Sequence, residues 1–145
     1  MIGPVLTPRV KICCIASVEE AWLAIKYGAS AVGLVSEMPS GPGPIPEDLI
    51  AKIARALPPS VSSFLLTAKQ EPSDIILHHR RCGTNVIQLV DRVKIDDYNE
   101  LREAMPGIRL VQVVHVAGEA ALKHGPVVER PPPHGHGVRL VQARI

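Results

Sequence analysis

The chain has little of several residue types that mark specialised classes of protein. Aromatic residues make up 3% of its 145 residues, and of its three cysteines two are adjacent, at Cys13 and Cys14. Such cysteines do not form the disulfide framework of a small secreted domain. No apolar run exceeds five residues, as at 12–16, and the amino terminus lacks the apolar core of a signal peptide. We therefore expect a cytoplasmic protein with no membrane partner.

The chain also lacks a strong net charge. Lys and Arg number 16 against 14 Asp and Glu, which gives a net charge of +2. This is too small to indicate nucleic acid as a partner. An apolar content of 46% with 21% charged residues is typical of a globular domain. Because aromatic residues are rare, the core must consist of Val, Ile, Leu and Ala.

Short β-rich runs alternate with helical patterns through the first 122 residues. The runs are apolar almost throughout, which is typical of parallel strands covered on both faces. Their starts lie about 20 to 30 residues apart, which is the spacing of repeated βα units. We therefore predict an α/β fold whose parallel strands follow the chain order, with helices outside. The predicted strands are 10–15, 31–35, 62–67, 85–90 and 109–116.

Local signals predict where the helices begin. Ser17 and Glu20 have the spacing of a capping box before the first helix, and Asp97 and Glu100 have it before the fourth. Proline at the first turn favours the start of a helix. The second and third helices are predicted to open at Pro46 and Pro72.

Two stretches rich in proline and glycine interrupt the pattern. Residues 39–46 (PSGPGPIP) follow the second predicted strand, where a stiff, open loop would border a site. Residues 125–137 contain three consecutive prolines, which a central strand excludes, and 138–145 again look strand-like. We therefore divide the chain into a domain of βα repeats, 1–122, and an atypical tail, 123–145.

Several segments resemble, in order, phosphoribosylanthranilate isomerase, an enzyme of tryptophan biosynthesis. Val10–Cys13 resembles the family's first strand, V-K-I-C-G, and Gly28–Val35 resembles its second, G-A-D-A-x-G-F-V. Ala56–Pro59 matches a helix ending, and Val86–Leu89 stands where the family has V-Q-L. The resemblance covers roughly residues 9–122. It implies that the chain forms the first five βα units of a TIM barrel, hence an incomplete barrel.

The resemblance also implies an activity, that of an intramolecular aldose–ketose isomerase. The reaction is the Amadori rearrangement of N-(5-phosphoribosyl)anthranilate, so the implied partner is a phosphorylated small molecule. A general acid opens the ribose ring to a Schiff base, a thiolate removes the C2 proton, and the enolamine tautomerises. Because the imine is the electron sink, no cofactor or metal is expected. Apolar strand edges favour a homodimer, or closure of one edge by residues 138–145.

The sequence departs from the family pattern at several functional positions. Cys14 stands where the family has glycine, Gly43 or a neighbour where it has a substrate-binding arginine, and Val90-Asp91 where it has His-Gly. The family's general-acid aspartate on the sixth strand and its phosphate loops have no counterpart. We therefore expect weak or no turnover and assign no general acid. The alternatives are a non-catalytic remnant, truncated by a frameshift near residues 122–125, and a half-barrel that binds a phosphorylated metabolite.

Cys13 is the candidate general base. On a strand it shares a face with Lys11, and the resemblance places it inward at the carboxyl end of the barrel. A free thiol ionises with a pKa near 8.5, so a cation such as Lys11 would favour the reactive thiolate. In the alternative interpretation, Cys13 and Cys14 are small buried core residues. Cys82, next to a helix-ending glycine, is expected to be a partly buried structural thiol.

Other polar residues have two interpretations each. Lys11 and Gln88 could support the base, or they could join Gln112 in a polar layer of the core, because a buried lysine needs a partner. His134 and His136, with His115 or His124 nearby in sequence, have the residue types of a metal site. No feature of this Gly/Pro-rich segment fixes their geometry, so we predict no metal site.

Overall fold

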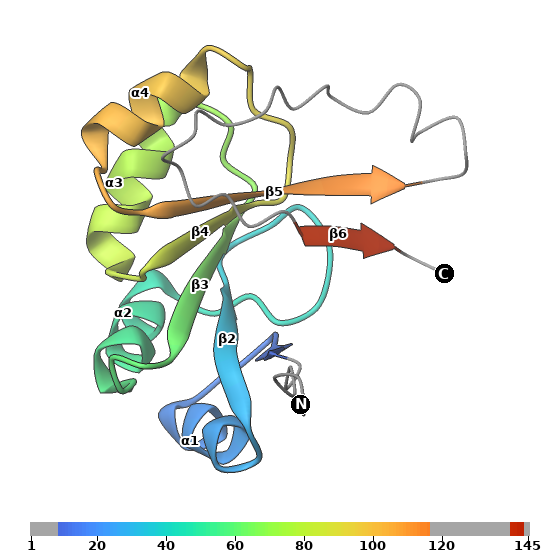
Figure 1. Cartoon of the computed structure of the whole chain (residues 1–145), viewed down its shortest axis with the longest axis vertical. Helices are drawn as coiled ribbons and strands as arrows, with labels where there is room; N and C mark the ends of the chain where they lie inside the picture. Colours follow the sequence, from blue (N-terminus) through green and yellow to red (C-terminus); the bar gives the residue numbers. More distant parts are fainter. Residues whose placement is uncertain (1–8, 117–139, 144–145) are drawn as a thin grey trace, which may run out of the picture.

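The structure is a computed structural model that describes residues 9–116 and 140–143. These residues form one six-stranded sheet in the order β1-β2-β3-β4-β5-β6, and a helix follows each of the first four strands (Figure 1). The strands are β1 (Val10–Ile12), β2 (Ala29–Val35), β3 (Ser62–Thr67), β4 (Val86–Leu89), β5 (Arg109–Val116) and β6 (Leu140–Ala143). The helices are α1 (Val18–Lys26), α2 (Glu47–Ala56), α3 (Pro72–Cys82) and α4 (Asp97–Ala104).

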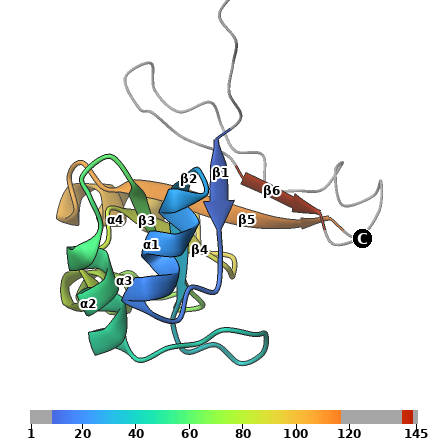
Figure 2. The same cartoon turned by 90° about the horizontal axis from the view of Figure 1, so that it is seen from below.

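The predicted α/β architecture is confirmed. All neighbouring strands pair in parallel, and the four helices cover the same face of the sheet (Figures 1 and 2). The sheet is open, because no pairing joins β1 to β6 among the described residues. The fold therefore consists of successive βα units in an incomplete barrel.

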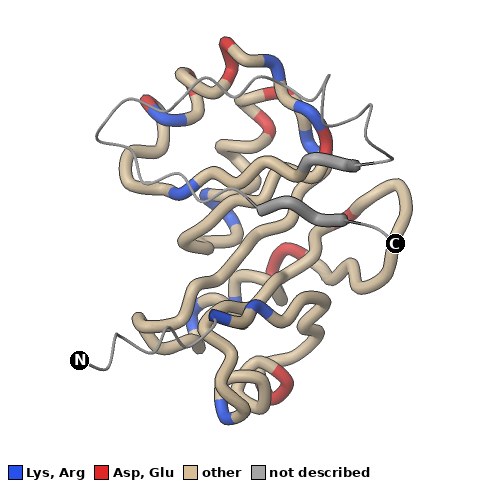
Figure 3. Tube along the Cα trace, turned by 45° about the vertical axis from the view of Figure 1, so that its right-hand side comes forward, with Lys and Arg blue, Asp and Glu red and all other residues tan. Residues whose placement is uncertain are grey.

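Side chains alternate between two apolar layers, one on each face of the sheet. On the helix side, Val32 and Leu34 of β2 pack with residues of α1 and α2, and a second cluster joins β4 to α3 and α4. The other face carries a cluster without helical residues. Its buried members are Ala31, Val35, Phe64, Leu66, Val86 and Val111. Charged residues lie mainly on helices and loops, and Lys11 and Arg109 are the charged residues of β1–β5 (Figure 3).

The first strand is shorter than predicted. It ends at Ile12 rather than at residue 15, because Cys14 has a φ of 59°. This left-handed conformation is incompatible with a continuing strand. The chain still contacts β2 beyond the break, since the amide of Ile15 donates to the carbonyl of Gly33 at 3.2 Å.

The helix caps are confirmed in one of the two predicted cases. Ser17 Oγ accepts from the amide of Glu20, whose carboxylate accepts from the amide of Ala16 at 2.7 Å. The capping box at Asp97 is wrong, since the helix already starts at this residue and its cap position, Asp96, makes no side-chain hydrogen bond. Asp96 has a helical backbone, whereas a side-chain cap requires an extended one.

Residues 140–143 cover one sheet edge, which agrees with one of the predicted alternatives. β6 pairs with β5 from Val113↔Leu140 to Val116↔Ala143. The predicted domain boundary at 122 and the second proline-rich stretch, 125–137, lie outside the described residues. Within 9–116 and 140–143, no helix is long and apolar enough to cross a membrane.

Candidate functional site

The site is built around Cys13, which follows β1 at the carboxyl end of the sheet. Its thiol lies against Gly33 of β2. A Cβ atom at Gly33 would lie 2.6 Å from Cys13 Sγ and 3.2 Å from Cys13 Cα, which is closer than van der Waals contact allows. Gly33 alternates with Val32 and Leu34 on the helix side, so it faces the opposite, helix-free side. Glycine at this position therefore makes room for the Cys13 thiol on the face predicted to hold the site.

The proline-glycine loop lies against Cys14, as its position after β2 predicts. Cys14 Sγ lies 3.6 Å from the carbonyl oxygen of Pro42, and a Cβ atom at Gly43 would lie 2.7 Å from Cys14 Cβ. The loop is anchored back on the sheet, since Pro44 forms a bridge with Val35. The two cysteines thus lie against glycines of two different segments.

Exposure separates the three thiols. Cys13 and Cys14 are exposed and Cys82 is buried. The interpretation of Cys13 and Cys14 as buried core residues is therefore wrong, because the left-handed turn at Cys14 takes both residues out of the strand. Cys82 is more buried than expected, and burial raises the pKa of its thiol to about 12. The chemically available thiols are those at the end of β1.

Lys11 and Gln88 meet on the helix-free face. Lys11 Nζ donates to Gln88 Oε1 at 2.7 Å and lies 4.7 Å from the centroid of the Phe64 ring. Gln88 is buried, so the amide oxygen and the aromatic ring together stabilise a half-buried ammonium group. Gln112 does not join them, which corrects part of the prediction. Its amide instead donates to main-chain oxygens of Leu89 and Asp91.

A second polar group, which the sequence did not reveal, lies between the sheet and the helices. Thr67 Oγ1 of β3 is 3.1 Å from His78 Nδ1 of α3, and His78 Nε2 is 3.5 Å from a carboxylate oxygen of Glu47 of α2. Burial lowers the pKa of His78, and the negative charge of Glu47 opposes this shift. The order of groups is that of a hydroxyl–imidazole–carboxylate triad. Thr67 is 0% exposed and His78 3% exposed, so the hydroxyl cannot reach a substrate and the group is structural.

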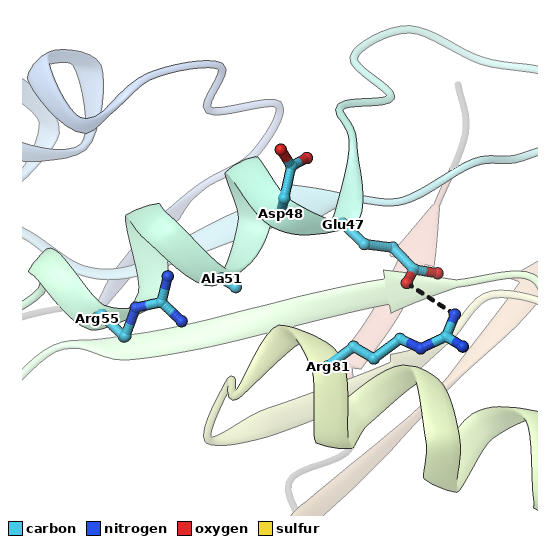
Figure 4. A pocket seen from close by; sticks show the side chains of 5 residues that line it. All are labelled: Glu47, Asp48, Ala51, Arg55 and Arg81. Carbon is cyan, nitrogen blue, oxygen red and sulfur yellow. Dashed lines mark hydrogen bonds and ion pairs between the residues drawn. The ribbon is translucent and has the colours of Figure 1, made fainter.

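A shallow groove lies beside this group, between α2 and α3. Its lining comprises Glu47, Asp48, Ala51, Arg55 and Arg81, and Arg81 Nη1 lies 3.4 Å from Glu47 Oε2 (Figure 4). The guanidinium of Arg81, near the end of α3, therefore links α3 to α2. None of the predicted site residues lines this groove. The chemistry expected from the sequence lies at the sheet, not here.

Some candidate residues cannot be placed. His124, His134 and His136 lie outside the described residues, and the side chain of His115 is also outside them. That these histidines form no metal site therefore stays a prediction from sequence alone.

Curated relatives with similar sequences are isomerases of one kind. The chain is 31% identical over 115 residues to N-(5'-phosphoribosyl)anthranilate isomerase 2 of Methanosarcina mazei, which covers 79% of this chain and 51% of the relative. It is 29% identical over 108 residues to N-(5'-phosphoribosyl)anthranilate isomerase of Methanocella arvoryzae, covering 74% and 51%. The chain thus spans about half the length of the curated relatives it matches. No family model matches the sequence.

Solved structures with the same fold carry the same name. One is a phosphoribosylanthranilate isomerase in complex with reduced 1-(o-carboxyphenylamino)-1-deoxyribulose 5-phosphate, with a TM-score of 0.71 and 28% identity over 81% of this chain and 58% of that one. Another, from Thermotoga maritima, has a TM-score of 0.77 over 96% of this chain and 63% of that one; at 24% identity it supports the fold alone. A third concerns monomers generated from the dimeric Thermotoga maritima protein, with a TM-score of 0.70 and 26% identity over 81% and 58%.

Proposed function

We propose, from the premise that this chain belongs to the phosphoribosylanthranilate isomerase family, that its site performs the Amadori rearrangement of N-(5-phosphoribosyl)anthranilate in tryptophan biosynthesis. The observation that carries the proposal is the position of Cys13. Its thiol is exposed at the carboxyl end of β1 and lies over Gly33 on the helix-free face. Catalytic groups of (βα) barrels lie at this end of the strands.

Cys13 acts as the general base. Once the ribose ring has opened to the Schiff base, the thiolate removes the C2 proton and the electron pair moves toward the imine nitrogen. The product is an enolamine, which tautomerises to the 1-deoxyribulose. The protonated imine takes up this electron pair, so the step requires no cofactor from this chain. A base contributes only when it lies within hydrogen-bond reach of the proton that it removes. Gly33 leaves room for the Cys13 thiol on the helix-free face, which is where the proposal puts the substrate.

Lys11 and Gln88 supply a positive charge on the same face of the sheet as the Cys13 thiol. The Lys11 ammonium is two residues before Cys13 and is tied to Gln88 at 2.7 Å. The pair places a positive charge on the face where a phosphorylated substrate and a thiolate both need one. The same hydrogen bond also gives the half-buried ammonium of Lys11 the polar partner that it needs as a structural residue of the sheet.

The general acid and the phosphate site are unassigned, so we expect slow turnover by the chain as printed. Loss of general-acid assistance costs about 10²–10⁴-fold in rate.

We propose that the reaction takes place in the cytoplasm. We also propose a homodimer that forms through an exposed strand edge. Because β6 pairs with β5, the sheet edge that remains open among the described residues is β1.

A labelling experiment tests the proposed site without requiring turnover. Cys13 is alkylated with iodoacetamide in the presence of reduced 1-(o-carboxyphenylamino)-1-deoxyribulose 5-phosphate, the compound bound in the related structure. Peptide mass spectrometry reads Cys13 and Cys14 separately after cleavage between them or by fragmentation. The proposal expects the analogue, at up to about 1 mM, to slow alkylation of Cys13 at least tenfold.

The neighbouring thiol is the matched control. Cys14 is also exposed but lies against Pro42 and Gly43 rather than over the sheet, so its labelling should change less. Unchanged labelling of Cys13 at saturating analogue, or equal slowing of both thiols, would contradict the proposed site.

A further inference from the structure

Two exposed thiols stand next to one another at the end of β1. Cys13 and Cys14 are adjacent and both exposed, whereas Cys82, the remaining cysteine, is buried. The proposed function uses the thiol of Cys13 and gives the thiol of Cys14 no role. Thiols react with thiol-seeking reagents when they are accessible. The pair is therefore a chemical feature that the proposed activity does not explain.

Both cysteines line the same cavity, an open groove of about 440 Å³ between β1 and α1. Cys13 Sγ lies over Gly33, and Cys14 Sγ lies 3.6 Å from the carbonyl oxygen of Pro42. A thiol is a weak hydrogen-bond donor, so this contact holds the Cys14 side chain only weakly. A change of the Cys14 rotamer therefore costs little, which lets the two sulfur atoms approach a common ligand.

The spacing of the pair favours a bridging atom over a direct disulfide bond. The described chain contains no cis peptide bond, and consecutive Cα atoms across a trans peptide are about 3.8 Å apart. The Cα atoms of disulfide-linked residues usually lie about 4.4–6.8 Å apart. A direct bond between Cys13 and Cys14 would therefore be strained. An atom bound between the two sulfur atoms lengthens the bridge and relieves this strain.

The pair offers two soft ligands. Within 9–116 and 140–143, no group of three or more His, Cys, Asp and Glu side chains could hold a metal ion, whereas structural zinc takes four ligands. Thiolates prefer soft, thiophilic atoms. Trivalent arsenic suits two thiols, because it forms two As–S bonds and carries its third substituent itself. An organic substituent would contact apolar side chains that line the groove, which include Ile12, Leu23 and Tyr27.

We propose that Cys13 and Cys14 form a dithiol site that captures trivalent arsenicals bearing one organic group. The arsenical reacts as its dihydroxide, R–As(OH)₂. Two As–S bonds form and two As–O bonds break, each thiol proton leaves with a hydroxide as water, and arsenic stays trivalent. The reaction therefore needs no oxidant or reductant. Capture would block Cys13 as a base, but the site itself does not rest on the proposed activity and is tested without substrate.

Phenylarsine oxide is the probe, added to the full chain after reduction with a phosphine and removal of the reductant. We expect intact-mass spectra to show one phenylarsenic group per chain, and peptide fragmentation to assign it to Cys13 and Cys14. Ellman's reagent should then detect neither of the two exposed thiols of the native chain. Excess 2-mercaptoethanol should leave the adduct in place and 2,3-dimercaptopropanol should remove it, because a dithiol competes effectively with a chelate.

Single-thiol variants test whether both sulfur atoms bind the arsenic. Cys13→Ala and Cys14→Ala should each weaken binding of phenylarsine oxide at least about 100-fold, because the second As–S bond of the parent chain forms intramolecularly. Cys82→Ala is the matched control, since its thiol is buried, and it should bind like the parent chain. Circular dichroism checks the fold of each variant, and the peptide assignment tests the role of Cys82 independently of this variant.

Arsenite separates the contribution of the groove from that of the thiols, because it carries a hydroxyl group in place of the phenyl ring. Leu23 is 55% exposed and Tyr27 80% exposed, so replacing either leaves the core intact. Leu23→Ser and Tyr27→Ser should each weaken binding of phenylarsine oxide about threefold or more, since apolar contact area is lost. Binding of arsenite should stay unchanged in both variants.

Four results would overturn the proposal. One is tight binding that survives in Cys13→Ala or Cys14→Ala, and another is an adduct that excess 2-mercaptoethanol removes. The third is ready conversion of the pair to an internal disulfide by glutathione disulfide, seen as a loss of two hydrogens, because a direct bond would then be favoured. The fourth is binding of phenylarsine oxide that neither Leu23→Ser nor Tyr27→Ser weakens, since the groove would then not select an organic group.

Discussion

Replacing Gly33 by alanine tests whether this glycine makes room for the Cys13 thiol. Gly33 lies inside β2 and has no positive φ, so its backbone conformation does not require glycine. In an ordinary strand, alanine would be favoured over glycine by about 0.5–1 kcal/mol. The neighbour reverses this expectation, because the new Cβ atom would lie 2.6 Å from Cys13 Sγ.

The magnitude follows from the overlap. Carbon and sulfur at contact lie about 3.5–4 Å apart, so the thiol must move by about 1 Å. Overpacking of this kind costs about 1–3 kcal/mol. The preference of a strand for alanine over glycine offsets part of this cost, so Gly33→Ala should lower the free energy of unfolding by about 1–2 kcal/mol. In a Cys13→Ala background the sulfur is gone, and we expect a cost near zero.

Urea unfolding followed by far-UV circular dichroism measures all four members of this double-mutant cycle. The expected coupling between the two positions is about 1 kcal/mol or more. A Gly33→Ala variant that is more stable than the parent chain would refute the reasoning. So would an equal loss of stability in both backgrounds, which would show that the thiol does not lie over Gly33.

Three further predictions concern neighbouring groups. Cys14→Gly should stabilise the chain by about 0.5–1 kcal/mol in the same unfolding assay, because glycine adopts the left-handed φ of 59° without the cost of a Cβ atom, whereas Cys14→Ala should bring no such gain. A native-state titration with Ellman's reagent should find two fast thiols and a third only after unfolding, because burial raises the pKa of Cys82 to about 12; three fast thiols would contradict the buried position. The pKa of His78 is lowered from 6.5 by burial, so its contribution to stability is present above pH 6.5 and lost as the pH falls below it. The urea midpoint should therefore fall less between about pH 8 and 5 for His78→Gln than for the parent chain. Equal falls would show that His78 does not cause the pH dependence.

The architecture could be predicted because it depends on local patterns. Uninterrupted apolar runs at regular spacing indicate buried parallel strands, and Ser17 and Pro72 mark helix starts by local chemistry. The end of β1 could not be predicted in this way. Cys14 adopts a left-handed turn against Pro42 and Gly43, and this contact joins positions almost thirty residues apart.

The candidate site was predicted only in part, for the same reason. Cys13 was singled out by the family resemblance, and Lys11 and Gln88 by their polar side chains inside apolar strands. The group of Thr67, His78 and Glu47, by contrast, comes from three different elements. Its members form no spacing pattern, so the sequence carried no signal for it. Gly33 did carry one, because glycine inside a strand often marks a close approach of another group.

The central claim is that Cys13 removes the substrate proton, and turnover of the Cys13→Ala variant tests it most directly. The chain, Cys13→Ala and Cys14→Ala are each mixed with freshly generated N-(5-phosphoribosyl)anthranilate, and the loss of anthranilate-type fluorescence is followed. We predict slow turnover above the spontaneous rate for the chain and for Cys14→Ala, and none for Cys13→Ala. Turnover by Cys13→Ala at the rate of the parent chain would contradict the account.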